Sequence, residues 1–207
     1  MPVAGFATFV NALAVSGGTP AKTFNEYVAW VKQQGGKGSV GIPAPASTPE
    51  FLVKVVGEKY KLDLVAAPYR GSAPMMADML GNQIPAGIAS VQDFMENHKA
   101  GKLRVIGVLG TRRQATMPEV PTLAEQGVAL ESNSWQGLLA PGATPDALVQ
   151  RINAAVVKAL AEPAVVDAFA RGGIVSQAGT AQQFAAFVTS EIAKYEAIIR
   201  RANITLG

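Results

Sequence analysis

Short apolar runs alternate with helical stretches along the first half of this 207-residue chain, and this alternation constrains the fold more than any other feature. Apolar runs of about five residues bounded by Gly, Pro or Ser are typical of buried strands, whereas apolar residues three and four apart are typical of helices. The pattern predicts strands at 9–15, 39–42, 62–67, 84–89 and 103–109. Strands separated by helices favour parallel βαβ units with right-handed crossovers. The first half is therefore predicted to be α/β with a parallel sheet.

The second half is different, because it combines three predicted helices with one plausible strand. The helices begin near Thr144, after Pro163 and at Thr180, and the strand covers the sequence SWQGLLAP. The third helix has a strongly apolar face, which includes Phe184, Phe187 and Ile192 and has to be covered by something. Either these helices pack on the first sheet, or the chain lacks part of a second domain.

The composition argues against several classes of function. The net charge of +3 suits a small anionic ligand and is too weak for a nucleic-acid-binding tail. The chain has no cysteine, a single histidine (His98) and no Gly-x-Ser-x-Gly motif, so no catalytic residue, metal site or cofactor is predicted. A small α/β enzyme remains a disfavoured alternative. No apolar run is long enough to cross a membrane, and no cation precedes the apolar start of the chain, so a strand is preferred there over a signal peptide.

Three strand-to-helix turns lie on one edge of the predicted sheet. Ligands of open parallel sheets bind outside the carboxyl ends of the strands. Each turn also opens a helix whose first amides lack partners and carry the positive end of the helix dipole. The candidate ligand-binding residues are Ala44, Pro45, Ala46, Ser47 and Thr48 in the first turn, Tyr69, Arg70, Gly71 and Ser72 in the second, and Ala89, Ser90 and Val91 in the third. Because every such turn needs capping residues, ordinary scaffolding is the alternative.

Several specific motifs follow one another along the chain, among them PYRG at 68–71, AGKLR at 100–104 and PEVPT at 118–122. With the stretches around them, they resemble the Bug-type extracytoplasmic solute receptors of tripartite tricarboxylate transporters, and the resemblance extends from about residue 2 to the C-terminus. It implies a type II periplasmic-binding-protein fold in which two α/β domains close on a small carboxylate. On this basis, residues 1–110 are expected to form one complete parallel-sheet domain, the second domain of the family. Residues 111–207 are expected to form the C-terminal part of the first domain, an incomplete α/β domain rich in helices.

The resemblance implies a receptor that captures a small organic carboxylate in the periplasm and delivers it to the membrane components of the transporter. The three turns match the family's second-domain ligand loops, and Trp135 matches a first-domain strand that faces the cleft. Arg70 is expected to add positive potential, and Tyr69 to form a wall or donate its hydroxyl. The three serines are expected to act as caps or direct donors: Ser47, Ser72 and Ser90.

The chain departs from the family at two places. The family usually has glycine where this chain has Ala46, which is expected to narrow or alter that subsite. Family members also begin with a signal peptide and about a hundred further residues that have no counterpart here. If the chain is the whole protein, it is expected to expose the apolar face of Phe184, Phe187 and Ile192, or to cover it by self-association. The alternative is a truncated remnant that no longer binds ligand and acts, if at all, through protein–protein contacts.

Overall fold

The computed structural model describes residues 1–128 and 133–201, and the chain separates into two compact units. The larger unit contains residues 10–134, and the smaller unit contains residues 1–9 and 135–207. These boundaries differ from the expected division at residue 110. The reason lies at the start of the chain, where a single strand, β1 (Pro2–Ser16), supplies residues to both units. The sequence pattern predicted only the second half of this strand.

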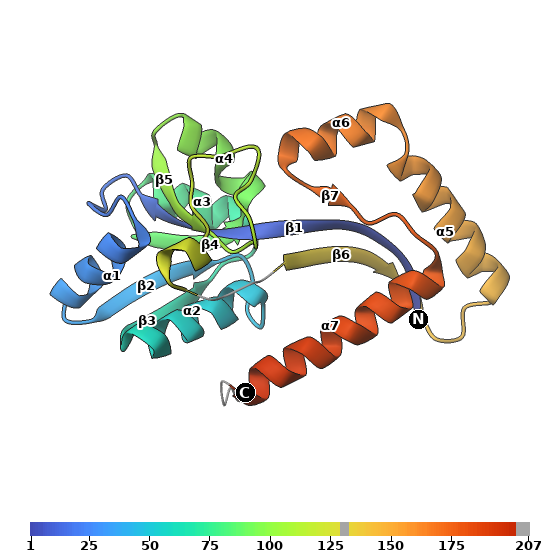
Figure 1. Ribbon diagram of the computed structural model, residues 1–207, viewed down its shortest axis with the longest axis horizontal. Helices are drawn as coiled ribbons and strands as arrows, with labels where there is room; N and C mark the ends of the chain where they lie inside the picture. Colours follow the sequence, from blue (N-terminus) through green and yellow to red (C-terminus); the bar gives the residue numbers. More distant parts are fainter. Residues whose placement is uncertain (129–132, 202–207) are drawn as a thin grey trace. The chain divides into compact units, whose positions relative to one another are not determined.

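The larger unit is built on a five-stranded sheet with the order β3-β2-β4-β1-β5 (Figure 1). Its other strands are β2 (Lys37–Ile42), β3 (Asp63–Pro68), β4 (Ala86–Ser90) and β5 (Leu103–Val108). β2 pairs in parallel with β3 and β4, as predicted, but β1 pairs antiparallel with both β4 and β5. The expectation of an all-parallel sheet was therefore wrong for β1. The end of β1 lies beside the starts of its neighbours, with Val15 opposite Ala86 and Ser16 opposite Leu103. Because β2 runs parallel to β4, β2 starts at the same side of the sheet where β1 ends. The segment that contains α1 therefore does not have to cross the length of the sheet.

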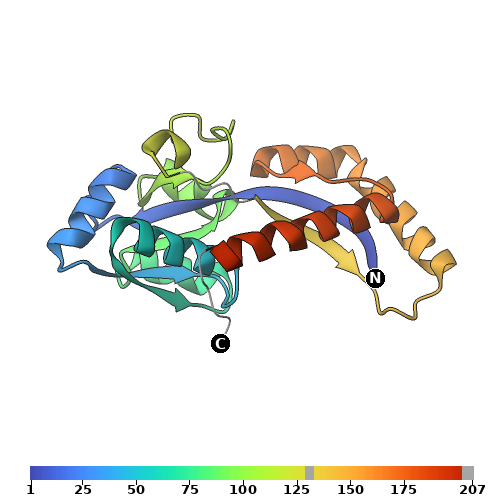
Figure 2. The same ribbon diagram turned by 60° about the horizontal axis from the view of Figure 1, so that its bottom comes forward.

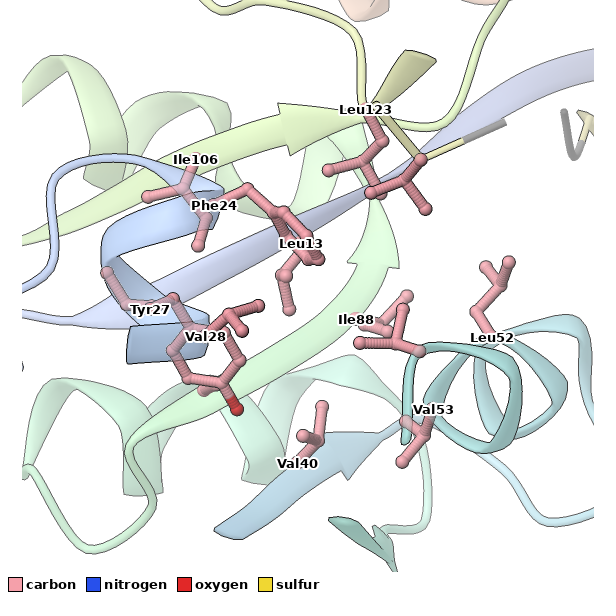
Figure 3. Close-up of a cluster of buried hydrophobic side chains, with 14 of the residues drawn as sticks. Leu13, Phe24, Tyr27, Val28, Val40, Leu52, Val53, Ile88, Ile106 and Leu123 are labelled. Carbon is pink, nitrogen blue, oxygen red and sulfur yellow. The ribbon is translucent and has the colours of Figure 1, made fainter. Parts of the chain in front are cut away.

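Helices cover both faces of this sheet. They are α1 (Phe24–Gln33), α2 (Thr48–Tyr60), α3 (Ser72–Leu80) and α4 (Val91–Lys99), and a short 3-10 turn, η1 (Ala124–Gln126), follows β5. Alternate residues of β1 point to opposite faces. Accordingly, Leu13 and Val15 pack in one core cluster with α1 and α2, while Ala12 and Ala14 pack in another with α3 and α4. Figure 3 shows the first cluster, where side chains from α1 and α2 meet those of the strands.

The smaller unit has fewer strands and a much smaller core. β6 (Asn133–Leu139) and the two-residue β7 (Val175–Ser176) both pair with β1. The helices are α5 (Asp146–Leu160), α6 (Pro163–Gly172) and α7 (Ala181–Arg201), close to their predicted positions (Figure 2). The short strand β7 has no counterpart among the predicted strands. Among the described residues, the buried cluster of this unit contains Val3, Val149 and Ala181, and the partly buried Leu138, Ala140 and Ile152 pack against it.

The apolar face of α7 is only partly exposed, so the expectation made for it is correct in one part and wrong in another. Ile192 is 56% exposed, as expected, whereas Phe184 is only 4% exposed. The Phe184 ring lies over Gly137, where an added Cβ would approach its Cζ to 2.1 Å. The glycine therefore makes room for the ring on the sheet. Phe187 is half-buried beside it, with the two ring centroids 6.4 Å apart.

Candidate functional site

The three turns identified in the sequence follow β2, β3 and β4, which are neighbours in the sheet. These strands run parallel, so their carboxyl ends lie at one edge, and the turns lead directly into α2, α3 and α4. The sheet thus brings together three helix N-termini from separate parts of the sequence. Unpaired amides and the positive ends of helix dipoles gather at this edge, which is the arrangement that binds anions.

Two backbone hydrogen bonds connect the first turn to the second. The Tyr69 N–H donates to the Ile42 carbonyl and the Gly71 N–H donates to the Pro43 carbonyl, each at 2.8 Å. These bonds continue the β2–β3 pairing beyond the strands. Gly71 has φ of 100°, a conformation that residues with a Cβ rarely adopt. The backbone of this turn therefore favours glycine at this position of the motif.

The first turn carries a residue in the left-handed conformation. Ala46 has φ of 50°, which explains in physical terms why glycine suits this position and why alanine is strained there. Its N–H donates to the Glu50 carboxylate at 2.8 Å, and this hydrogen bond is the main cause that lowers the pKa of Glu50, with Lys54 adding to it. The side chains of Ala44, Pro45 and Ala46 are exposed.

The helix start in this turn differs from the prediction. A threonine followed by a proline, as at Thr48 and Pro49, predicts a helix N-cap at Thr48. In the structure Thr48 is instead the first residue of α2, and Ser47 is the N-cap. The Ser47 hydroxyl makes no capping bond and donates instead to the Ala44 carbonyl at 2.6 Å. It stabilises the loop in front of the helix, not the helix itself.

The second turn carries an aromatic hydroxyl and a cation. The Tyr69 hydroxyl donates to Asp78 at 2.7 Å, and burial followed by this hydrogen bond raises the pKa of Tyr69 to about 12. The phenol is therefore neutral at physiological pH and already has an acceptor. Arg70 is exposed, and within the described residues its guanidinium has no hydrogen-bond or ion-pair partner.

The third turn is linked to the second through a residue that the sequence analysis did not select for the site. Asp93, in the first turn of α4, accepts the Ser72 hydroxyl at 2.8 Å and the Ser90 hydroxyl at 2.5 Å. The spacing of three positions from Ser90 to Asp93 is typical of a helix cap, but Ser90 makes no side-chain capping bond. The side chains of Ala89 and Val91 are buried in the core, which leaves only their backbone groups for a ligand.

Trp135 lies in the smaller unit, where it belongs to an aromatic group on β6 and α7. Its ring packs edge-on against Phe184 and Phe187, each with a centroid distance of 5.6 Å. The side chain is half-buried. This packing is typical of a tryptophan that fills a core, and the expected ligand contact stays a prediction.

The lone histidine has a structural role. His98 Nδ1 accepts the Val105 N–H at 3.2 Å, and its Nε2 faces a Glu119 carboxylate oxygen at 3.2 Å. The side chain thus ties the end of α4 to β5. Among residues 1–128 and 133–201, no group of three or more metal-ligating side chains comes together, and no helix has the length and hydropathy of a membrane span.

The comparison with protein families agrees with the resemblance found in the sequence. A family model described as "Tripartite tricarboxylate transporter family receptor" matches residues 1–204. Among curated proteins, "Protein BugT" of Bordetella pertussis is 28% identical over 180 residues, which cover 86% of this chain and 55% of that protein. The chain spans 55% to 62% of the length of the first three curated relatives it matches.

Solved structures with the same fold cover the whole chain. One, described as "Structure of a periplasmic transporter", is 31% identical with a TM-score of 0.91, covering 100% of this chain and 69% of its own. Another, the R. palustris protein Rpa4515 solved with adipate, is 26% identical with a TM-score of 0.91, covering 99% of this chain and 69% of its own. The type II periplasmic-binding-protein-like α/β fold expected from the sequence is confirmed by these matches.

Proposed function

Because the chain belongs to the family of tripartite tricarboxylate transporter receptors, we propose that it binds a small organic carboxylate at the edge formed by its three turns. It would then present this ligand, in the periplasm, to the membrane components of a transporter. The observation that carries the proposal is the convergence of three helix N-termini at one sheet edge, with Arg70 beside them and free of partners in the described part of the chain. The solved relative with bound adipate supports a carboxylate as the ligand class.

The hydrogen bonds of the site determine which groups are free to hold the anion. The hydroxyls of Tyr69, Ser72 and Ser90 already donate within the protein. Ser47 does so as well, at the Ala44 carbonyl. Within the described residues, the N–H groups of Ala46, Tyr69 and Gly71 are also taken. The donors that remain at the turns include their other backbone N–H groups, the Thr48 hydroxyl and the Arg70 guanidinium. The family matches are receptors, and this set of donors suits binding more than catalysis.

The available interactions are large enough for useful affinity. A helix N-terminus contributes about 0.3–1 kcal/mol to an anion, and a charge-assisted hydrogen bond about 1.5–3 kcal/mol. Three termini and a few such bonds therefore reach the ~8 kcal/mol of micromolar binding. Because an exposed cation is screened by solvent, the amides contribute more of this energy than Arg70 does.

A thermal-shift titration tests the proposal. The chain would be titrated with acetate, succinate, adipate, malate and citrate, in parallel with Arg70→Ala and with Arg112→Ala, which removes an exposed arginine outside the turns. At a hundred times the Kd, a ligand adds ~2.7 kcal/mol to the free energy of unfolding. We expect a selective shift that Arg70→Ala weakens and Arg112→Ala keeps. A cooperative melt that no carboxylate shifts would contradict the proposal.

The second candidate function is a remnant that has lost ligand binding and acts through protein contacts. It is favoured by apolar side chains that the smaller unit leaves exposed, such as Val175 at 59% and Ile192 at 56%. Size-exclusion chromatography with light scattering, run beside the titration, separates the two candidates. A monomer with a carboxylate-specific shift supports the receptor, whereas self-association without any shift supports the remnant.

A further inference from the structure

One carboxylate bridges two of the three turns. Asp93 Oδ1 accepts the hydroxyl of Ser72, the first residue of α3, and Asp93 Oδ2 accepts the hydroxyl of Ser90, the last residue of β4. Ser90 is 6% exposed, and the other two side chains are half-buried. The carboxylate therefore uses each of its oxygens on a different turn, in a partly dry environment where such bonds are strong.

An ordinary helix cap does not account for this arrangement. In a capping box the N-cap hydroxyl accepts a backbone N–H of the first helical turn, which Ser90 does not do in α4. The bond to Ser72 also reaches 21 positions back along the sequence, to another helix. A residue that served only the dipole of α4 would need neither serine.

We propose that Asp93 is a positioning residue that holds the turn at 69–72 and the turn at 89–91 in one fixed relation. The Gly71–Pro43 backbone bond then extends the connection to the first turn, so that all three turns form one linked edge. For its effect on ligand, this inference rests on the proposed function. An ionised carboxylate only accepts hydrogen bonds, so Asp93 draws both serine protons toward itself and leaves the backbone amides to hold the anion.

The first test needs no ligand. Hydrogen exchange is measured by NMR for the Gly71 amide and for the amides of residues 90–94, in the wild type, Asp93→Ala and Glu96→Gln. Glu96→Gln removes the same charge from an exposed position of α4. In Asp93→Ala we expect exchange to become about 5–10-fold faster in both turns. In the wild type a turn has to break the bridge before it can open, and in the variant it does not. The control should match the wild type. Faster exchange confined to α4 would overturn the proposal.

A second variant keeps the test decisive if Asp93→Ala does not fold. Ser72→Ala breaks one arm of the bridge and leaves the Ser90–Asp93 bond in place. We expect faster exchange at Gly71 and no change at residues 90–94. In the double variant Ser72→Ala/Asp93→Asn, exchange at Gly71 should be no faster than in Ser72→Ala. The first substitution already removes the Ser72–Asp93 hydrogen bond, so the second cannot remove it again. Additive increases at Gly71 would overturn the proposal.

The effect on binding is measured by calorimetry with adipate, or with whichever acid of the titration panel shifts the wild type. Asp93→Asn keeps one acceptor oxygen and Asp93→Ala keeps none, while both remove the same charge. We expect affinity to fall about 3-fold in the first and 10-fold or more in the second. Tighter anion binding in both would show that Asp93 acts only as a negative charge, and would overturn the positioning role. If no acid binds the wild type, the proposed function fails, while hydrogen exchange still decides whether the bridge exists.

Discussion

The larger and smaller units are both α/β, but they differ greatly in how much apolar surface they bury. The larger unit packs two clusters, one on each face of its sheet, and its largest fully buried side chains include Phe24, Tyr27 and Phe94. In the described part of the smaller unit, the buried cluster of Val3, Val149 and Ala181 is much smaller, and Leu139, Val175 and Ile192 are more than half exposed. Because buried apolar area is the main stabilising term in folding, the larger unit should set the stability of the chain.

Each unit contains one of the two tryptophans, which makes this comparison measurable. Trp30 lies on α1 of the larger unit and Trp135 on β6 of the smaller unit. Trp135→Phe leaves fluorescence that reports on the larger unit, and Trp30→Phe leaves fluorescence that reports on the smaller unit. We expect the smaller unit to lose its signal at the lower denaturant concentration. Coincident transitions for the two probes would contradict independent behaviour of the units.

The largest expected effect is that of Phe24→Ala in the larger unit. Phe24 is completely buried and meets the Tyr60 ring edge-on at 5.2 Å. Truncation leaves a cavity that costs about 3–5 kcal/mol. Urea unfolding followed through Trp30 should show this loss. Phe184→Ala is the matched truncation in the smaller unit, and it should move the Trp135 transition and leave that of Trp30 nearly unchanged.

A smaller loss is expected from Gly137→Ala in the smaller unit. The new Cβ would lie 2.1 Å from Phe184 Cζ and 2.9 Å from the Ala4 carbonyl oxygen, so the ring has to leave its place. Such overpacking costs about 1–3 kcal/mol. Gly142→Ala is the control, because a Cβ there meets no atom within 4 Å. Equal transitions of the two variants, followed through Trp135, would show that Phe184 is not held against the sheet.

A gain in stability is expected at Ala46 in the larger unit. Relief of the left-handed strain at φ of 50° should raise the free energy of unfolding by about 1–2 kcal/mol. The greater conformational freedom of glycine in the unfolded chain should lower it by about 0.4–1 kcal/mol. Ala46→Gly should therefore stabilise by roughly 0.5–1 kcal/mol in urea unfolding. Lys61→Gly, at φ of 55°, is a companion variant outside the candidate site and should gain a similar amount. Destabilisation by both would mean that these backbone angles carry no strain.

The smallest effect concerns pH and Glu50. The pKa of this carboxyl is lowered in the folded state, first by the Ala46 N–H. Its contribution to stability is therefore complete above the ordinary pKa of 4.5 and is lost as the pH falls through the lowered value. Between pH 7 and pH 3 the wild type should lose slightly more stability than Glu50→Gln, as measured by urea unfolding. An equal loss of stability below pH 5 in the two proteins would show that the hydrogen bond from the Ala46 N–H to Glu50 does not form in solution.

Local patterns in the sequence were sufficient to predict most of the elements and the three turns that lie at one edge of the sheet. Helix starts such as Thr180 with Gln183 rely on residues three positions apart, and both of their capping bonds form as that spacing indicates. The positions of the three turns follow from the βα alternation in the same way. These interactions are short in sequence, so the residues alone contain the information.

Features that depend on residues far apart in the chain were decided only by the tertiary structure. The antiparallel direction of β1 depends on which strands lie beside it, and no pattern within residues 2–16 contains that choice. The burial of Phe184 depends on a glycine 47 positions earlier. The bridge from Asp93 to Ser72 crosses 21 positions and two helices. Packing brings such residues together only after the local elements have formed, which is why the carboxylate that links the turns could not be recognised from its own neighbourhood.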